Sequence, residues 1–255
     1  MKFTFLGTGT SQGVPMIGCK CEICTSSDAK DQRLRSSLMV DSGTHRLVID
    51  TGPDFRQQML REGVDSLDCV VFTHEHKDHI AGLDDVRAFN YLQRKPMDVY
   101  ASLQVQTALK REFFYIFNGD NYPGIPKINL HTITNEPFQI AGIQLLPIPV
   151  MHLNMPVLGF RIGNFSYVTD ANFISEESKS LIRNSEVLVL NTLRIEKHVS
   201  HFNLAEAMEL VDELKPKITY LTHISHQLGL HELIENELPD NIRLAYDGLV
   251  LEVDC

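Results

Sequence analysis

The sequence has no long apolar run, no low-complexity segment and no internal repeat. None of its apolar stretches approaches the roughly 20 residues that a helix needs to cross a bilayer, so we expect no membrane span. The N-terminus turns glycine-rich after a few apolar residues and shows no signal peptide, so we expect a cytoplasmic protein. No linker divides the chain, and we therefore interpret residues 1–255 as a single domain.

Basic residues are also scarce. There are 23 of them against 33 acidic residues, which gives a formal net charge of −10. Three divalent ions and three bound thiolates would bring the sum to roughly −7. Because non-specific binding to nucleic acid requires a basic surface, nucleic acid is disfavoured as a partner. A small anionic substrate held by metal ions is compatible with this charge, and a homodimer stays open as an oligomeric state.

Three of the five cysteines lie close together as Cys19-x-Cys21-x-x-Cys24, while Cys69 and Cys255 stand apart. In a reducing compartment, such crowding favours a metal over a disulfide. A tetrahedral metal would then take its fourth ligand from elsewhere in the chain. A redox pair is the alternative, but the trio lacks an isolated C-x-x-C and its helix context. Cys69 lies in an apolar run, which predicts an inert core residue.

Short apolar runs separated by turn residues predict a strand-rich chain with a few helices. The predicted strands cover residues 1–6, 37–40, 46–49, 67–72, 187–191 and 218–221, and residues 127–170 form a β-rich region with a hairpin turn at Gly163-Asn164. The predicted helices cover residues 80–92, 103–117, 175–182 and 203–215, and residues 118–126 form a loop. Asn203 and Glu206 have the spacing of a capping box. The α/β pattern predicts two packed sheets with helices outside.

The strongest signal is the segment His74-x-His76-x-Asp78-His79, directly after a predicted buried strand. His74 and His76 project to the same side of an extended chain, because side chains alternate along it. Imidazole nitrogens and a carboxylate suit zinc, iron and manganese. Four candidate ligands exceed the need of one tetrahedral ion with an open position, which predicts a two-metal site. The position after a buried strand argues against the alternative, a solvated polar loop.

Three more candidate ligands follow predicted strands: His152, Asp170 and His223. Each one alone is more typical of a structural polar residue. Their shared position at strand ends, where loops meet to form sites, favours ligands instead.

The ordered series from His74 to His223 resembles that of the metallo-β-lactamase superfamily over nearly the whole chain. The resemblance implies an αββα four-layer sandwich of two mixed sheets with outer helices. Asp50 resembles the family's early aspartate, which is mostly structural.

A narrower resemblance is to the phosphoribosyl cyclic phosphodiesterases of bacterial phosphonate breakdown. The matching segments are residues 7–15 (GTGTSQGVP), the cysteine trio, residues 221–227 (LTHISHQ) and Asp247-Gly248. This resemblance implies one metal held by His74, His76 and His152. It implies a second metal held by Asp78, His79 and His223, with Asp170 bridging the two. It also implies His226 as the fourth ligand of a structural zinc with Cys19, Cys21 and Cys24, which would brace the loop that carries His223.

His201 lies two residues before Asn203 at the start of a predicted helix. In the resembling family, a histidine at this place is the catalytic acid or binds phosphate. A relative in that family has Asp at the position of Asn203, so a His–Asp pairing is in question here. A surface histidine is the alternative. Asp78 and His201 are therefore the candidate catalytic residues.

The sequence features predict a metal-dependent hydrolase, and the resemblance implies a phosphoric diester hydrolase with two zinc or manganese ions and one structural zinc. Its expected substrate is a small cyclic phosphate, such as a phosphoribosyl or nucleoside cyclic phosphate, attacked by a metal-bound hydroxide. A nuclease like tRNase Z is an alternative, but the chain shows no basic insertion for tRNA. A coenzyme pyrroloquinoline quinone (PQQ) biosynthesis protein shares the cysteine pattern, and a non-catalytic metal-binding regulator is the third alternative.

Overall fold

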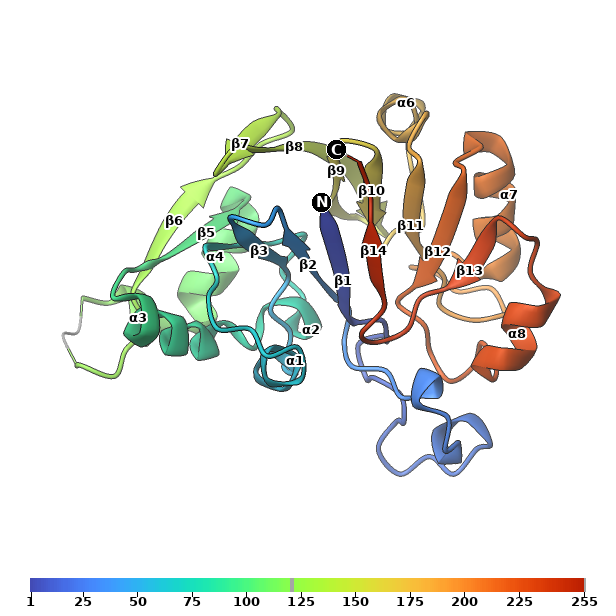
Figure 1. Ribbon diagram of the computed structural model, residues 1–255, viewed down its shortest axis with the longest axis horizontal. Coiled ribbons are helices and arrows are strands. Elements are labelled where there is room, and N and C mark those ends of the chain that lie inside the picture. Colours follow the sequence, from blue (N-terminus) through green and yellow to red (C-terminus); the bar gives the residue numbers. More distant parts are fainter. Residues whose placement is uncertain (120–121, 255) are drawn as a thin grey trace.

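The computed structural model describes residues 1–119 and 122–254. Two seven-stranded sheets face each other, and helices cover their outer faces (Figure 1). The strand order is β14-β1-β2-β3-β4-β5-β6 in the first sheet and β13-β12-β11-β10-β9-β8-β7 in the second. Both sheets mix parallel and antiparallel pairs, as at β3–β4 and β8–β9. The expected αββα sandwich is confirmed.

The elements follow in chain order. The first sheet contains β1 (Lys2–Gly7), β2 (Ser37–Asp41), β3 (Arg46–Ile49), β4 (Cys69–Val71), β5 (Met97–Ala101), β6 (Ile128–Thr132) and β14 (Val250–Glu252). The second sheet contains β7 (Phe138–Ile140), β8 (Ile143–His152), β9 (Met155–Ile162), β10 (Phe165–Val168), β11 (Val187–Asn191), β12 (Ile218–Thr222) and β13 (Ile242–Leu244). The α-helices are α1 (Phe55–Arg61), α2 (Lys77–Ile80), α3 (Arg87–Gln93), α4 (Leu103–Glu112), α5 (Phe114–Phe117), α6 (Glu176–Ile182), α7 (Leu204–Leu214) and α8 (His231–Glu237). Short 3₁₀ helices cover Ile23–Thr25, Ala29–Asp31 and Leu83–Val86.

Three apolar cores occupy the interfaces between the four layers. Between the sheets, the Phe3 ring stacks on Phe165 with centroids 3.8 Å apart. Outside the first sheet, a second core includes Phe55 of α1 and Phe89 of α3. Outside the second sheet, a third core includes Val211 of α7. Burying these rings and branched side chains is the main driving force for assembling the layers.

Two predicted helices are wrong in their extent. The expected helix 80–92 is divided into the end of α2, a 3₁₀ turn and α3, because the backbone makes a close contact at Gly82. An ideal Cβ on Gly82 would lie 2.1 Å from the carbonyl oxygen of Gly52. The expected helix 103–117 is divided at buried Phe113, whose φ and ψ of −116° and 43° are not helical.

The other expected elements agree in type with the structure, although the strand expected at 67–72 covers Cys69–Val71 alone. The described part of the expected loop 118–126 contains no helix or strand, and Asp120 and Asn121 lie outside the described residues. The strands β5, β13 and β14 and the helices α1 and α8 were not predicted. Within the described residues, no helix is both long and apolar enough to cross a bilayer.

Helix α7 begins with the expected capping box. The Asn203 side chain accepts a hydrogen bond from the Glu206 backbone N–H at 2.9 Å, and the Glu206 carboxylate accepts one from the Asn203 N–H at 3.1 Å. This start fixes the helix directly after the loop that carries His201.

We expect Asn203→Ala to lower the free energy of unfolding by about 1 kcal/mol, because it leaves a backbone N–H of the first turn without a partner. Asn203→Asp is the matched control, since it keeps the acceptor and adds a favourable charge at the helix N-terminus. Urea unfolding followed by circular dichroism measures both. Equal stability of Asn203→Ala and the unmodified protein would contradict the role of the cap.

Candidate metal centre

The predicted ligands meet at one end of the sandwich, where loops follow the strands of both sheets. The segment His74–His79 follows β4 and forms the start of α2. His152 ends β8, Asp170 comes two residues after β10, and His223 comes directly after β12. All of these side chains are buried except His76, which is half-buried. The structure therefore brings together residues that are far apart in the sequence, such as His74 and His223, which are 149 positions apart.

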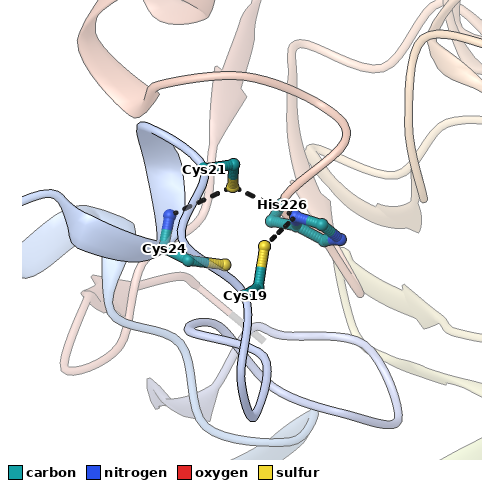
Figure 2. A group of neighbouring side chains, drawn as sticks. All are labelled: Cys19, Cys21, Cys24 and His226. Carbon is teal, nitrogen blue, oxygen red and sulfur yellow. Dashed lines mark hydrogen bonds between the residues drawn. The ribbon is translucent and has the colours of Figure 1, made fainter.

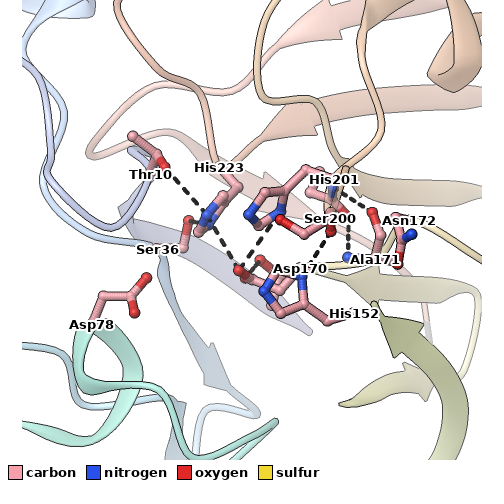
Figure 3. A network of polar contacts seen from close by, with 12 residues as sticks. Thr10, Ser36, Asp78, His152, Asp170, Ala171, Asn172, Ser200, His201 and His223 are labelled. Carbon is pink, nitrogen blue, oxygen red and sulfur yellow. Dashed lines mark hydrogen bonds and ion pairs between the residues drawn. The ribbon is translucent and has the colours of Figure 1, made fainter. Parts of the chain in front are cut away.

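Four residues converge most tightly. The ligand atoms of Asp78, His79, Asp170 and His223 all lie within 4.8 Å of one another. His79 Nε2 is 3.2 Å from a carboxylate oxygen of Asp78 and 3.2 Å from one of Asp170, yet this buried nitrogen has no hydrogen-bond partner. His223 Nε2 is likewise 3.2 Å from Asp170 (Figure 3). A divalent cation between these atoms would satisfy them, so this donor set fits a metal ion.

The other expected ligands lie beside this cluster. The rings of His74, His76 and His152 have centroids between 4.8 and 6.1 Å apart. His74 Nε2 is buried without a hydrogen-bond partner, as expected for a nitrogen that faces a cation. His152 also forms a group within 4.8 Å with Asp170 and His201. His201 therefore lies within the metal centre itself, closer to the candidate ligands than its place in the sequence indicated.

Four of the histidines are oriented through Nδ1, which leaves Nε2 free to bind a metal. The clearest case is His79, whose Nδ1 lies 2.7 Å from a carboxylate oxygen of buried Asp50. The other Nδ1 contacts are His74 to Thr73 Oγ1 at 2.9 Å, His152 to the Ser200 carbonyl at 2.7 Å and His223 to Ser36 Oγ at 3.2 Å. Asp50 was expected to be mostly structural, and its carboxylate contacts His79 here. Thr73, Ser36 and Ser200 were not predicted, and no pattern in the sequence distinguishes them.

Three residues of the site have a left-handed backbone. The φ angles are 66° at Asp50, 55° at Asp170 and 57° at His223. Such angles cost a non-glycine residue of order 1 kcal/mol or more and persist where the surroundings enforce them. Asp50 is held by the N–H and hydroxyl of Thr73, which donate to its carboxylate at 2.9 and 2.8 Å. The strained turns aim these side chains into the site directly at the ends of β3, β10 and β12.

Burial and the carboxylates determine the charges in the site. Burial lowers the pKa of His74 and His223, which keeps both imidazoles neutral and able to bind a metal. Burial opposes the charged form of His79 as well, but Asp170 and Asp78 raise its pKa well above the ordinary value. Burial would raise the pKa of Asp170, but nearby His223 and His79 hold it well below its usual range. In the free protein, the site therefore presents ionised carboxylates and the neutral imidazoles of His74 and His223, whereas His79 is protonated and would lose this proton on binding a cation.

The cysteine trio forms a second cluster, on a loop that projects from the sandwich. Figure 2 shows Cys19, Cys21 and Cys24 with His226, whose ligand atoms all lie within 4.8 Å of one another. His226 Nδ1 is 3.6 Å from Cys19 Sγ and 3.3 Å from Cys21 Sγ. Zinc bonds of about 2.3 Å to sulfur and about 2.05 Å to nitrogen place these atoms roughly 3.6 Å apart in a tetrahedron. The four residues therefore fit the structural zinc site that the resemblance implied.

The two clusters are joined by one short segment. His226 lies three residues after His223, and between them Ile224 pairs with the glycine-rich N-terminal loop. The Thr10 N–H donates to the Ile224 carbonyl at 3.1 Å, and the Ile224 N–H donates to the Thr8 carbonyl at 2.9 Å. A metal at the cysteine cluster would therefore brace the loop that presents His223.

Comparison with known proteins agrees with this geometry. A family model described as "Beta-lactamase superfamily domain" matches residues 45–224. A solved structure described as a new diphosphatase from the PhnP family is 40% identical, with a TM-score of 0.93, over 99% of this chain and 98% of that one. The chain therefore belongs to the metallo-β-lactamase superfamily and, within it, to the PhnP family. Both relationships support a hydrolase.

Two other relatives carry different names. The octanoyltransferase of Porphyromonas gingivalis is 38% identical over 258 residues, which is 100% of this chain but 52% of that protein. The coenzyme PQQ synthesis protein B of Methylobacterium radiotolerans is 34% identical over 58% of this chain and 52% of that protein. This chain thus spans about half the length of these curated relatives.

We expect Cys21→Ser to lower the metal content by one ion per chain, from three to two, because serine is a poor zinc ligand. Cys69→Ala is the control, since Cys69 is buried in the core between the sheets and away from both clusters. Elemental analysis of the purified proteins gives the metal-to-protein ratio. The same ratio in Cys21→Ser and the unmodified protein would contradict the structural zinc.

Gly52 provides a second test, because an ideal Cβ there would lie 2.1 Å from the Asp78 carbonyl oxygen. We expect Gly52→Ala to push α2 away from the Asp50 loop, to cost about 1–3 kcal/mol of stability and to weaken metal binding. Gly63→Ala is the control, because Gly63 has a φ of 61° and open space around it, and should cost about 1 kcal/mol with normal metal content. Normal metal content in Gly52→Ala would contradict the packing argument.

Proposed function

We propose that this protein is a dinuclear metal-dependent phosphodiesterase that hydrolyses a small phosphate ester, such as a phosphoribosyl or nucleoside cyclic phosphate. The observation that carries the proposal is the buried cluster of Asp78, His79, Asp170 and His223, in which a histidine nitrogen and two carboxylates crowd one point without hydrogen bonds between them. The similarity to a diphosphatase over nearly the whole chain supports phosphorus–oxygen bond hydrolysis.

The proposed ligands of the two divalent ions, zinc or manganese, are those that the resemblance implied. His74, His76 and His152 would hold one ion, Asp78, His79 and His223 the other, and Asp170 would contact both. When bound, the ions would supply an activated water as nucleophile and positive charge for the phosphoryl oxygens. Asp78 would contribute to catalysis in this proposal as a ligand of the second ion. A third ion, a structural zinc, would occupy the cysteine cluster.

His201 is the proposed partner of the leaving group. Its ring lies between His152 and His223, with centroids 4.6 and 4.9 Å away, and its buried Nδ1 has no hydrogen-bond partner. Asn203 does not orient it, because the Asn203 amide is engaged by the Glu206 N–H and the Ile195 carbonyl. Instead, His201 Nδ1 faces Asp170 at 3.9 Å.

Burial, followed by the nearby His223, lowers the pKa of His201 to about 3. The free protein therefore holds His201 neutral at physiological pH, with one N–H available to donate to a phosphoryl oxygen. To protonate a leaving alkoxide, His201 first needs the negative charge of a bound phosphodiester, which raises its pKa. In this proposal His201 first donates a hydrogen bond to the phosphate of the bound substrate. The negative charge of that phosphate raises the pKa of His201, which then acts as the general acid.

A substrate panel tests the proposal directly. It consists of bis(p-nitrophenyl) phosphate, cyclic phosphates and diphosphate diesters, each with zinc or manganese. Turnover of a cyclic phosphate supports the proposal, whereas turnover of diphosphates alone favours the activity named for the PhnP-family neighbour. Failure to hydrolyse any ester would favour a non-catalytic metal-binding role. An octanoyl-thioester assay tests the activity named for the Porphyromonas relative, half of which lies outside the match.

We expect His201→Ala to keep its metals and to lose about 100-fold or more in kcat with a poor leaving group such as an alkoxide. With p-nitrophenolate, which leaves without a proton, the loss should be much smaller. His45→Ala is the control, because His45 lies on the β2–β3 turn, away from the metal centre. Equal losses for both leaving groups would remove the general-acid role and leave the phosphate contact.

A further inference from the structure

The turn between β8 and β9 has an unexpected residue at its tip. Leu153 directly follows His152, and its neighbours His152 and Met155 pair across the hairpin. Its φ is 54°, a left-handed conformation that glycine and asparagine adopt far more readily than leucine. Its side chain is also 51% exposed. Neither the backbone conformation nor the burial of apolar surface explains a leucine at this position.

A cavity of about 540 Å³ lies beside this turn. Its lining includes His76 and His152 of the candidate metal centre, and Leu153, Met155 and Pro156 provide its apolar surface. This cavity is a broad hollow that is open to solvent, and it is larger than a single phosphate requires. Glu75 is the one carboxylate among its lining residues, which include no lysine or arginine, and a carboxylate disfavours a second anion.

The Asn172 side chain joins the Leu153 turn to the His201 loop. The Asn172 Oδ1 accepts a hydrogen bond from the Leu153 N–H at 2.7 Å, and its Nδ2 donates to the Val199 carbonyl at 3.2 Å. Figure 3 shows Asn172 on the same side of the site as Ser200 and His201. Leu153 is therefore held in place next to the reacting centre rather than on an independent loop.

We propose that Leu153 contacts the substrate directly, as part of a subsite that binds an uncharged, partly apolar group attached to the phosphorus. This inference rests on the proposed phosphodiesterase function and narrows its substrate class to esters in which an organic group, such as a nucleoside or an aryl alcohol, extends past the metals. In this arrangement the strained, exposed leucine would cover the organic group of the bound ester.

The test compares two esters that share one leaving group, methyl p-nitrophenyl phosphate and phenyl p-nitrophenyl phosphate. The unmodified protein should prefer the phenyl ester in kcat/KM by about tenfold, as expected for an apolar pocket. Leu153→Asn should reduce that preference to about twofold and should not lower stability, because asparagine fits the left-handed turn. A change in preference with unchanged or higher stability would not result from unfolding.

The matched control is Ala141→Asn. Ala141 has a φ of 49° on the β7–β8 turn, which is distant from the cavity in the fold. This variant should gain or keep stability in the same way and retain the full phenyl preference. If Leu153→Asn retains the preference as well, the subsite proposal is overturned.

A binding measurement tests the Leu153 subsite separately from the proposed phosphodiesterase function. If the unmodified protein hydrolyses neither ester, the phosphodiesterase proposal fails, and calorimetry with phenylphosphonate and methylphosphonate then tests the subsite alone. Tighter binding of phenylphosphonate that is lost in Leu153→Asn supports the subsite, whereas equal affinities overturn it. Leu153 could instead contact a second copy of the chain, and sedimentation of both variants tests this alternative. If Leu153→Asn alone turns a dimer into a monomer, Leu153 belongs to a subunit interface and the proposal is wrong.

Discussion

The carboxylate of Asp170 is the group on which the arrangement of the site depends. It is almost fully buried, and it lies 3.2 Å from the Nε2 atoms of both His79 and His223. A buried anion is costly unless positive charge compensates it, so the surrounding nitrogens and any bound cation stabilise one another. Both halves of the sandwich contribute to this compensation, since His79 lies in α2, which follows β4 of the first sheet, and His223 directly follows β12 of the second. Packing of the sandwich brings these side chains together, so a metal ion that binds them would favour the folded state.

Much of the architecture and the meeting of the candidate ligands at one place could be predicted from the sequence. The period of apolar residues identified most strands, and the histidine motif after a buried strand predicted a site that the structure indeed assembles around Asp78 and His79. The resemblance supplied what spacing did not, namely the partner His226 for the cysteines. Closely spaced histidine, aspartate and cysteine residues can be recognised in the sequence, because few functions other than metal binding need these residue types at such spacing.

The remaining features depend on contacts between distant segments, which no local pattern encodes. The division of the expected helix 80–92 follows from the approach of Gly82 to Gly52, some 30 residues earlier (82 − 52 = 30). The serine and threonine residues that orient His74 and His223 are chemically ordinary, and their role arises from position alone. The backbone at Asp50, Asp170 and His223 is left-handed, and an aspartate or histidine at a strand end does not reveal this.

The pairing of β1 with β14 has a consequence for how the protein combines with others. The Met1 amino group donates to the Val253 carbonyl at 2.7 Å, so both ends of the described chain lie side by side (Figure 1). The metal centre lies at the other end of β1, where Thr10 approaches His223. A six-residue strand spans about 20 Å, which separates the termini from the reacting atoms. Such a layout makes the sandwich a modular unit: a further domain, as the length of the Porphyromonas relative suggests, can be joined at either end while the mouth of the centre stays open.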